Sequence, residues 1–424
     1  MPKKKKGYEW EIGGTLPELE EHSQAKHRVL DAYIQRYLRV MFADPRRPNM
    51  RLHVVDGFCG GGLYRAPGST NELPGSPFVI ADAMANVMAE IGLNRKNQPT
   101  LDAHLWMVDN SEKTIDFLKS TLMRRNLPPF VTSHIRHSDF ELVLDEILEK
   151  ISAGNSRTPR AIFLLDQYGY LDATYIQMRQ IFHRIAGAEI VLTFSTDTLL
   201  TYLTDNEHSR NSLKKLGLSP DEAEYVISQK REDQVSRSIV AKYITKLIVQ
   251  KSGAKFYTSF FIKSAESRRS YWLVHLSNQP RARDEMAQVH WEVNNHFIHH
   301  GRAGLEMLGY DPINEVGTQV LLPYMFDDDA KSRTHVSLLE DLPRSQLLDG
   351  DGRTHGDLLT QISNDTPGTH LQVQEALIEL QAHKEIEIVT PAGNLRRSAA
   401  GIKPDDRIRR CSQYVLRMDG GSPR

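Results

Sequence analysis

The stretch Leu52-His53-Val54-Val55-Asp56-Gly57-Phe58-Cys59-Gly60-Gly61-Gly62 decides the fold of this chain. An apolar run that ends in an acid and passes into glycines is typical of a buried strand entering a tight loop. Glycine lets the backbone adopt positive φ and approach a ligand closely, which a Cβ would prevent. The acid at the strand end can accept hydrogen bonds from a ligand in the crevice of a doubly wound sheet. Because plain turns use the same pattern, the rest of the chain has to show whether this stretch is a turn or a ligand-binding loop.

Four further strand-like segments follow the glycines, with helical segments between them. They span residues 103–109, 130–135, 161–166 and 188–194. Alternation of buried strands with helices predicts a parallel sheet covered on both faces. Two β-rich runs, at 255–262 and 271–276, predict a closing hairpin. The expected fold class is therefore α/β, with a doubly wound, mostly parallel, seven-stranded sheet.

Two helices are expected beside the glycine loop. Residues 26–38 carry apolar side chains at helical spacing and begin with basic residues. After an expected loop at 63–74, Ser76 followed by Pro77 predicts a helix that Ser76 caps. The free N–H groups of that helix start would suit an anionic ligand, although most Ser-Pro pairs only begin a helix.

Acidic residues stand at or just after the ends of the first four expected strands. They are Asp56, Asp109, Asp139 and Asp166. In a parallel sheet those ends share one edge, which is the ligand crevice. Four acids there suit an adenosine ligand: one after the glycines, one for the ribose hydroxyls, one for the adenine amino group and one facing the substrate. An NAD site fits poorly, because 109 − 56 = 53 residues separate the first two acids, whereas a dinucleotide fingerprint expects about 20.

The bulk composition excludes several classes of protein. Lys+Arg 53 against Asp+Glu 54 gives a net charge of −1, so no global basic field points to nucleic acid. Two cysteines, Cys59 and Cys411, argue against a disulfide framework, and no histidine spacing indicates a metal site. Lys3–Lys6 lack a following apolar segment, so they are not a secretory signal. We expect a cytoplasmic protein without a membrane-spanning segment.

The expected division of the chain has four parts. Residues 1–20 form a flexible basic arm, 21–282 an α/β domain with a helical insertion at 196–250, 283–335 a helical connector with a linker at Asp327–Asp329, and 336–416 a small C-terminal domain.

The C-terminal domain has the order of a winged helix. Helices at 352–362 and 369–383 precede a β-rich segment at 385–389. A hairpin follows, with Arg396 and Arg397 at its basic tip. A basic wing can contact the phosphates of DNA or RNA, and such domains serve protein contacts as well.

Several of these stretches together resemble a known family. They are Lys26-His27, Asp56–Tyr64, Gly75-Ser76-Pro77, Asp166-Gln167-Tyr168-Gly169, Tyr271–Ser277 and Gln279-Pro280. Over about residues 20–410 the chain resembles the three-Cys-motif partner protein (TcmP) family, which is similar to class I S-adenosylmethionine (SAM) methyltransferases. The resemblance implies a methyltransferase-like fold with a C-terminal winged helix. It also implies a separate partner that bears a three-cysteine motif and resembles radical-SAM proteins.

The resemblance also implies roles for individual residues. Asp56, Gly57, Gly60 and Gly62 would form the SAM loop, Asp109 would take the ribose hydroxyls, and Asp139 the adenine amino group. Asp166 would orient a target amine and Tyr168 would stack on a base. Gln167 stands where the family tends to have proline, and Gly169 where a methyltransferase motif ends in an aromatic residue. The sequence therefore leaves open whether the protein methylates a base.

Three readings follow from the sequence. The first is a SAM-dependent methyltransferase acting on nucleic acid, with Asp166 and Tyr168 at the reaction and Arg396 and Arg397 on the nucleic acid. The second is a non-catalytic module that keeps the fold and recruits nucleic acid or the three-Cys-motif protein. The third, a Rossmann oxidoreductase, fits the acid spacing poorly.

Overall fold

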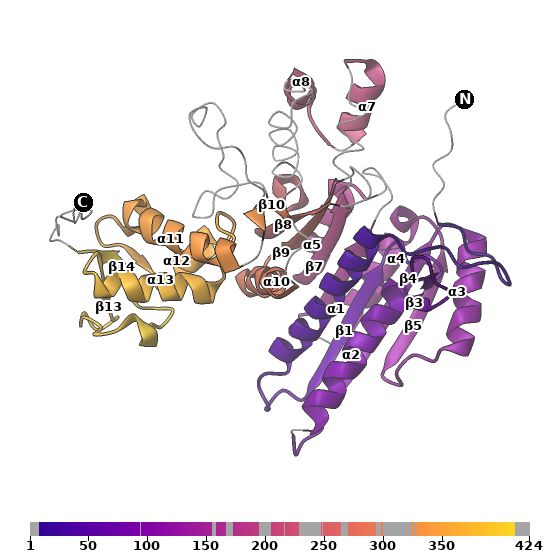
Figure 1. The fold of residues 1–424 in the computed structure, drawn as a ribbon, viewed down its shortest axis with the longest axis horizontal. Helices are drawn as coiled ribbons and strands as arrows, with labels where there is room; N and C mark the ends of the chain where they lie inside the picture. Colours follow the sequence, from indigo (N-terminus) through magenta and orange to yellow (C-terminus); the bar gives the residue numbers. More distant parts are fainter. Residues whose placement is uncertain are drawn as a thin grey trace. The chain divides into compact units, whose positions relative to one another are not determined.

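The computed structural model describes residues 8–93, 95–154, 158–166, 173–194, 205–215, 217–228, 247, 249–263, 270–293, 298–299, 324–325 and 328–411 (Figure 1). The chain divides into two compact units, Met1–Ile298 and His299–Arg424. The first unit is an α/β domain, and the second is a small domain of helices and a three-stranded sheet. The boundaries predicted at residues 282 and 335 stay predictions.

A seven-stranded sheet with the order β5-β4-β1-β6-β7-β9-β8 forms the centre of the first unit. Its strands are β1 (Asn49–Asp56), β4 (Thr100–Asp109), β5 (Val131–His137), β6 (Arg160–Leu165), β7 (Gly187–Phe194), β8 (Phe256–Lys263) and β9 (Ser270–Ser277). The first five are parallel, whereas β9 runs antiparallel to both β7 and β8. The predicted mostly parallel sheet with its closing hairpin is confirmed.

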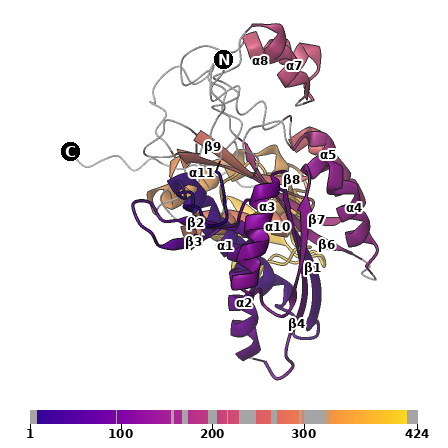
Figure 2. The same ribbon diagram turned by 90° about the vertical axis from the view of Figure 1, so that its right-hand side faces the viewer.

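Helices cover both faces of this sheet (Figure 2). On one face lie α1 (Glu21–Met41), α2 (Ser76–Leu93) and α3 (Glu112–Arg124), and on the other lie α4 (Phe140–Ser152) and α5 (Tyr175–Arg184). A further helix, α10 (Pro280–Val293), packs against α1, β8 and β9. Between β7 and β8 the structure describes two short helices that pack on each other, α7 (Glu207–Lys215) and α8 (Pro220–Ser228).

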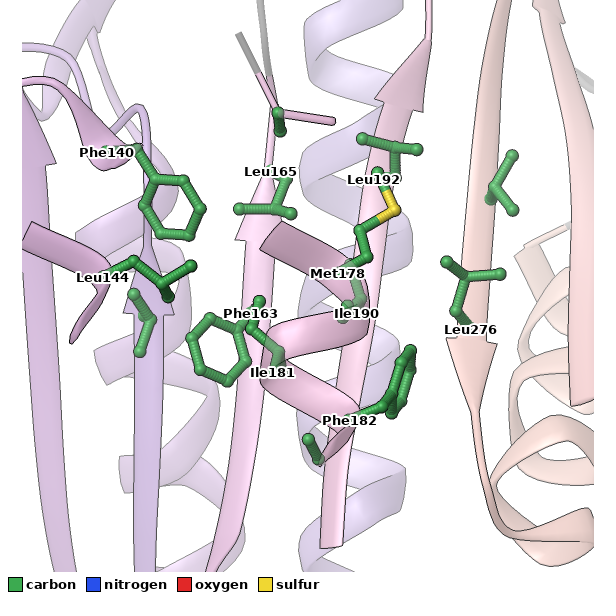
Figure 3. Packing of buried hydrophobic residues seen from close by; sticks show 14 of the residues in the cluster. Phe140, Leu144, Phe163, Leu165, Met178, Ile181, Phe182, Ile190, Leu192 and Leu276 are labelled. Carbon is green, nitrogen blue, oxygen red and sulfur yellow. The ribbon is translucent and has the colours of Figure 1, made fainter. Parts of the chain in front are cut away.

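The core between the sheet and α4 and α5 is aliphatic and aromatic. Phe163 and Ile190 from the sheet meet Leu144 of α4 and Ile181 of α5, and all four are fully buried (Figure 3). Burial of such side chains contributes about 1.5–3 kcal/mol each. Because alternate residues of a strand face opposite sides, this packing fixes the register of β6 and β7. The register in turn brings the carboxyl ends of the strands to one edge.

Helix α1 is held to the sheet by buried polar groups as well as by apolar packing. The Tyr33 hydroxyl donates to Glu189 of β7, and His275 Nε2 of β9 lies 3.0 Å from the same carboxylate. Arg36 of α1 donates to Glu285 and Glu292 of α10. Removing one member of the buried set of Tyr33, Glu189 and His275 leaves its partners unsatisfied, which costs more than the pair itself contributes. Helix α1 is thus fixed beside the strand ends.

Two local features differ from expectation. Residues 63–74, expected as a loop, contain a short hairpin of β2 (Leu63–Arg65) and β3 (Glu72–Pro74). The acids predicted as a linker near residue 328 begin helix α11 (Asp328–Arg344) instead. Carboxylates at a helix start interact favourably with its dipole, which explains why an acidic run opens a helix here.

Among the described residues, helix α2 is the one helix that is long and apolar enough to span a membrane by length and composition. Its 18 residues have a mean hydropathy of 1.2, which by length and composition alone is enough to cross a membrane. Half of the helix is buried, and it packs against α1 and β4. This is the packing of a core helix in a globular domain.

The second unit has the winged-helix order. Helix α11 is followed by η1 (Gln346–Leu348), β12 (Arg353–Thr354), α12 (His355–Ile362), α13 (His370–Ala382), β13 (Ile386–Val389), η2 (Ala399–Gly401) and β14 (Arg407–Arg410). The strands pair as β12-β14-β13. Thr369 caps α13 through a capping box with Gln372, as its sequence position suggests. Two-residue strands β10 (Ile298–His299) and β11 (Tyr324–Met325) pair with each other.

Candidate functional site

The four predicted acids lie at one edge of the sheet. Asp56 and Asp109 end β1 and β4, and Asp166 directly follows β6. Asp139 follows β5 by two residues and stands at the N-cap of α4. Since these four strands are parallel and adjacent, their carboxyl ends share one edge, as the sequence predicts.

Asp56 is buried and bound by two donors. Its side chain is 1% exposed, and it accepts hydrogen bonds from Ser76 Oγ at 2.5 Å and from the Phe58 N–H at 3.4 Å. Burial raises the pKa of Asp56 to about 7, and the charges of Asp166 and Asp109 add to the rise. Ser76 was predicted to cap α2, but the helix begins at Ser76 and its hydroxyl is directed to Asp56. The helix start is therefore joined to the strand end by this hydrogen bond.

Asp109 orders the glycine loop, whereas Asp139 is exposed. Asp109 accepts the Gly60 N–H at 3.2 Å and the Ser111 N–H at 2.9 Å, while burial raises its pKa. Asp139 accepts one bond from the Asn110 side chain at 2.8 Å. Each carboxylate retains lone pairs for a further donor such as a hydroxyl or an amino group.

The glycines of the loop serve close packing as well as turning. Gly60 and Gly62 have φ of 60° and 78°, which disfavour other residues. A Cβ on Gly57 would lie 3.0 Å from Phe140, and one on Gly62 would lie 2.8 Å from Phe78. Glycine at these two positions is explained by neighbouring side chains of the domain itself.

Trp10 lies over the loop, and the sequence reading missed it. A Cβ built on Gly60 would be 2.7 Å from its indole, and one on Gly61 would be 2.4 Å away. Trp10 is 7% exposed and its Nε1 donates to the Leu63 carbonyl at 2.7 Å. Trp10 and Leu19, in the segment expected as part of a flexible arm, are therefore packed on the domain. Two aromatic residues, Tyr8 and Trp10, close to Gly13-Gly14 were the available signal.

Asp166 forms an ion pair with Lys26 of α1. Lys26 Nζ lies 2.6 Å from Oδ1 and 2.5 Å from Oδ2 of Asp166. Partial desolvation pushes the pKa of Asp166 up, but Lys26 outweighs it together with a hydrogen bond from Thr193, so the pKa is lowered. Lys26-His27 is one of the stretches that carry the family resemblance, and in the structure Lys26 has Asp166 as its partner. Tyr168, predicted to stack on a base, lies outside the described residues.

A small cavity lies between α1 and the strand ends. Its volume is about 40 Å³, and its lining includes Lys26, His27, Asp56, Ser76, Asp166 and Thr193. Sites for small-molecule ligands usually measure about 300–1,000 Å³. The cavity is therefore smaller than most ligand sites, with Lys26 in its wall and Trp10 packed on the neighbouring glycine loop.

The two wing arginines differ in their surroundings. The Arg396 guanidinium donates to the carboxylate of Asp406, which is fully buried, so Arg396 joins the wing to the loop before β14. Arg397 is exposed, and among the described residues it forms no hydrogen bond or ion pair. Arg397 is thus the better placed of the two for contact with a phosphate.

Helix α13 has the chain position of a recognition helix, but its surface is not basic. Its sequence contains no lysine or arginine, and it exposes Leu371 (61%), Glu375 and Ile378 (38%). Acidic and apolar side chains suit a protein surface better than the phosphate backbone of a nucleic acid.

Comparisons with known proteins match part of the chain. Residues 309–393 match the family model of the GMT-like wHTH domain. No curated protein matches the chain.

Three solved structures are similar at low identity. Trm1 from Pyrococcus horikoshii with S-adenosyl-L-methionine is 11% identical, with a TM-score of 0.34, over 94% of this chain and 93% of that one. Protein LPL1258 from Legionella pneumophila is 10% identical, with a TM-score of 0.35, over 62% and 86%. The CMeT domain of citrinin polyketide synthase is 12% identical, with a TM-score of 0.24, over 55% and 47%. Similarity this weak decides neither fold nor function, and the strand order carries the fold. The chain is a mostly parallel seven-stranded α/β domain followed by a winged-helix domain, and residues 309–393 are similar to the GMT-like wHTH family model.

Proposed function

We propose that the α/β unit binds S-adenosylmethionine and acts as a methyltransferase. The observation that carries this proposal is the row of four acids at the carboxyl edge of the parallel strands, around a glycine loop that Asp109 orders. Asp109 and Asp139 offer acceptors for ribose hydroxyls and for the adenine amino group. Bound there, the cofactor would supply an activated methyl group.

The chain's own residues would fix the cofactor and shield it from water. Asp56, buried and hydrogen-bonded to Ser76, would hold the loop against the start of α2. Asp166 would orient the methyl acceptor, provided that Lys26 releases it. The Lys26 ammonium would then be free to meet an anionic group of cofactor or substrate.

The proposed methyl acceptor is a nucleic acid, and the support for it is limited to basic residues of the second unit. Arg353, Arg397 and Arg407 are exposed on β12, the wing and β14. Contacts of this kind hold phosphates and add affinity without reading sequence.

The alternative is a non-catalytic module that binds a protein partner. Two observations favour it: Asp166 is neutralised by Lys26, and the outward face of α13 is acidic and apolar. The family resemblance suggests the three-Cys-motif protein as that partner.

Calorimetric titration of S-adenosylhomocysteine into the full chain tests the cofactor proposal. We expect one site per chain, with affinity weakened by about tenfold or more in Asp109→Ala, because each lost charged acceptor costs about 1.5–3 kcal/mol. Asp116→Ala, an exposed carboxylate on α3, is the matched control. If the wild-type protein gives no heat of binding, the cofactor proposal is rejected. If the Asp166→Ala variant keeps its cellular function, the protein-binding alternative is favoured.

A further inference from the structure

Residues 8–20, here named the N-terminal strap, are held at two separate places. At its start Trp10 is buried against the glycine loop, with Tyr8 and Tyr64 around it at ring distances of 5.8 and 5.4 Å. At its end Leu19 donates to the Arg65 carbonyl at 3.0 Å, and Arg65 N–H donates to Pro17 at 2.9 Å. The second attachment thus joins the strap to β2 through two backbone hydrogen bonds.

The segment between the two attachments is loosely packed. Residues 11–15 are exposed, and Ile12 is 65% exposed although it is apolar. Gly13 has a φ of 81° and no heavy atom within 4 Å of the place where a Cβ would stand. A glycine in open space at positive φ is suited to a change of backbone direction. Trp10 is thus a buried anchor on a tether that can turn near Gly13.

The indole takes the space that a ligand of the glycine loop needs. Its ring atoms stand 2.4–2.7 Å from the places where Cβ atoms of Gly60 and Gly61 would be. Its Nε1 donates to the carbonyl of Leu63, which follows the loop. The Trp10 indole and its N–H thus contact the loop, and a ligand that binds the same loop would have to replace these contacts.

We propose that the N-terminal strap is a gate over the glycine loop, and that Trp10 is its latch. With the latch closed, a ligand binds only the fraction of molecules that are open, which weakens its apparent affinity by that fraction. This inference rests on the proposed function for the identity of the ligand, but the closed latch itself is a property of the chain alone.

Three variants test the gate. Trp10→Ala removes the latch, and Gly61→Ala places a Cβ where it pushes the indole away. Gly401→Ala is the control, because it adds a methyl group in the second unit at a position without positive φ and with no heavy atom nearer than 3.9 Å. Amide hydrogen exchange of residues 60–63 is measured without ligand, and S-adenosylhomocysteine is titrated into each variant.

We expect both Trp10→Ala and Gly61→Ala to speed exchange at residues 60–63, and we expect Trp10→Ala, which adds no atom to the loop, to tighten binding by about tenfold. Their effects on exchange should not add in the double variant, because both act through one side chain. Unchanged exchange in both variants, or weaker binding in Trp10→Ala, would overturn the gate. If the ligand binds neither wild type nor variants, the proposed function fails, and the exchange result still decides whether the latch exists.

Discussion

Lys26 Nζ on α1 lies 2.5 Å from Asp166 Oδ2 at the end of β6, and this pair links the N-terminal part of a helix to the candidate site. The Lys26 side chain is 11% exposed and that of Asp166 is 44% exposed. The contact neutralises the acid that would orient a methyl acceptor. Any chemistry at Asp166 therefore begins with a change at Lys26.

Lys26→Met removes the positive partner of Asp166 and keeps the aliphatic stem. We expect a loss of about 1 kcal/mol or less in the free energy of unfolding, since solvent screens a partly exposed pair. The pKa of Asp166 is lowered in the folded state, so its contribution is present above the unfolded pKa and is lost as pH falls. Urea unfolding near pH 7 and about pH 3 should show a flatter pH dependence in the variant. An unchanged profile would mean that the pair does not form in solution.

Asp56→Asn tests the buried acid with the raised pKa. A carboxyl whose folded pKa is about 7 stabilises the protein when protonated, and this contribution is lost as pH rises from about 4 to 7. We expect the amide, which can still accept from Ser76, to raise the free energy of unfolding by about 1–3 kcal/mol near pH 8. Asp116→Asn on the exposed face of α3 should leave it unchanged. A less stable Asp56→Asn protein near pH 8 would contradict the account.

The contribution of His53 to stability should depend on pH in the opposite direction to that of Asp56. It is 5% exposed, stacks on His104 at 4.6 Å and accepts from Trp106 Nε1 at 3.4 Å. Burial lowers the pKa of His53 to about 4, with His104 and Arg51 adding to the effect. The contribution of neutral His53 to the free energy of unfolding is thus fully present above about pH 6.5 and is lost as pH drops toward 4.

The loss attributable to His53 should be on the order of 1–2 kcal/mol between about pH 7 and pH 5. His53→Asn keeps an acceptor for Trp106 and cannot take up a proton, so unfolding experiments should show a smaller loss in this variant. An equal loss in the variant and the wild type would assign the acid sensitivity to other groups.

Arg397→Glu is the cleaner test of nucleic-acid contact by the wing. Arg396→Glu would also place a second acid beside buried Asp406 and destabilise the domain. We expect Arg397→Glu to weaken binding of an oligonucleotide severalfold. The slope of the logarithm of the binding constant against the logarithm of the salt concentration should fall by about 1. The control is Arg46→Glu, an exposed arginine of the first unit. Binding that is absent in wild type, or unaffected in Arg397→Glu, would favour the protein-binding role of this domain.

The sheet could be predicted because its strands are short apolar runs that end in acids or turn residues. Residues 52–56 are the buried part of β1. The hydrophobic pattern does not reveal the three residues that begin the strand, because Asn49 and Arg51 are exposed and Met50 is half-buried. The alignment of Asp56, Asp109 and Asp166 follows from parallel strands and needs no side-chain detail.

The contacts of the site could not be predicted in the same way. Lys26 and Asp166 are 140 residues apart, and Trp10 and Leu63 are 53 apart. Such pairs depend on where α1 and the N-terminal strap pack, which local periodicity does not encode. Ser76 shows the limit most clearly, because its sequence position predicts a helix cap while its hydroxyl is bound to Asp56.

The central claim is that an adenosine ligand binds at the acidic edge of the sheet. Amide hydrogen exchange with and without S-adenosylhomocysteine measures this directly on the full chain. We predict slower exchange in residues 56–63 and 109–111, and no change in residues 328–411. Protection absent from the glycine loop, or confined to the winged-helix domain, would contradict the claim.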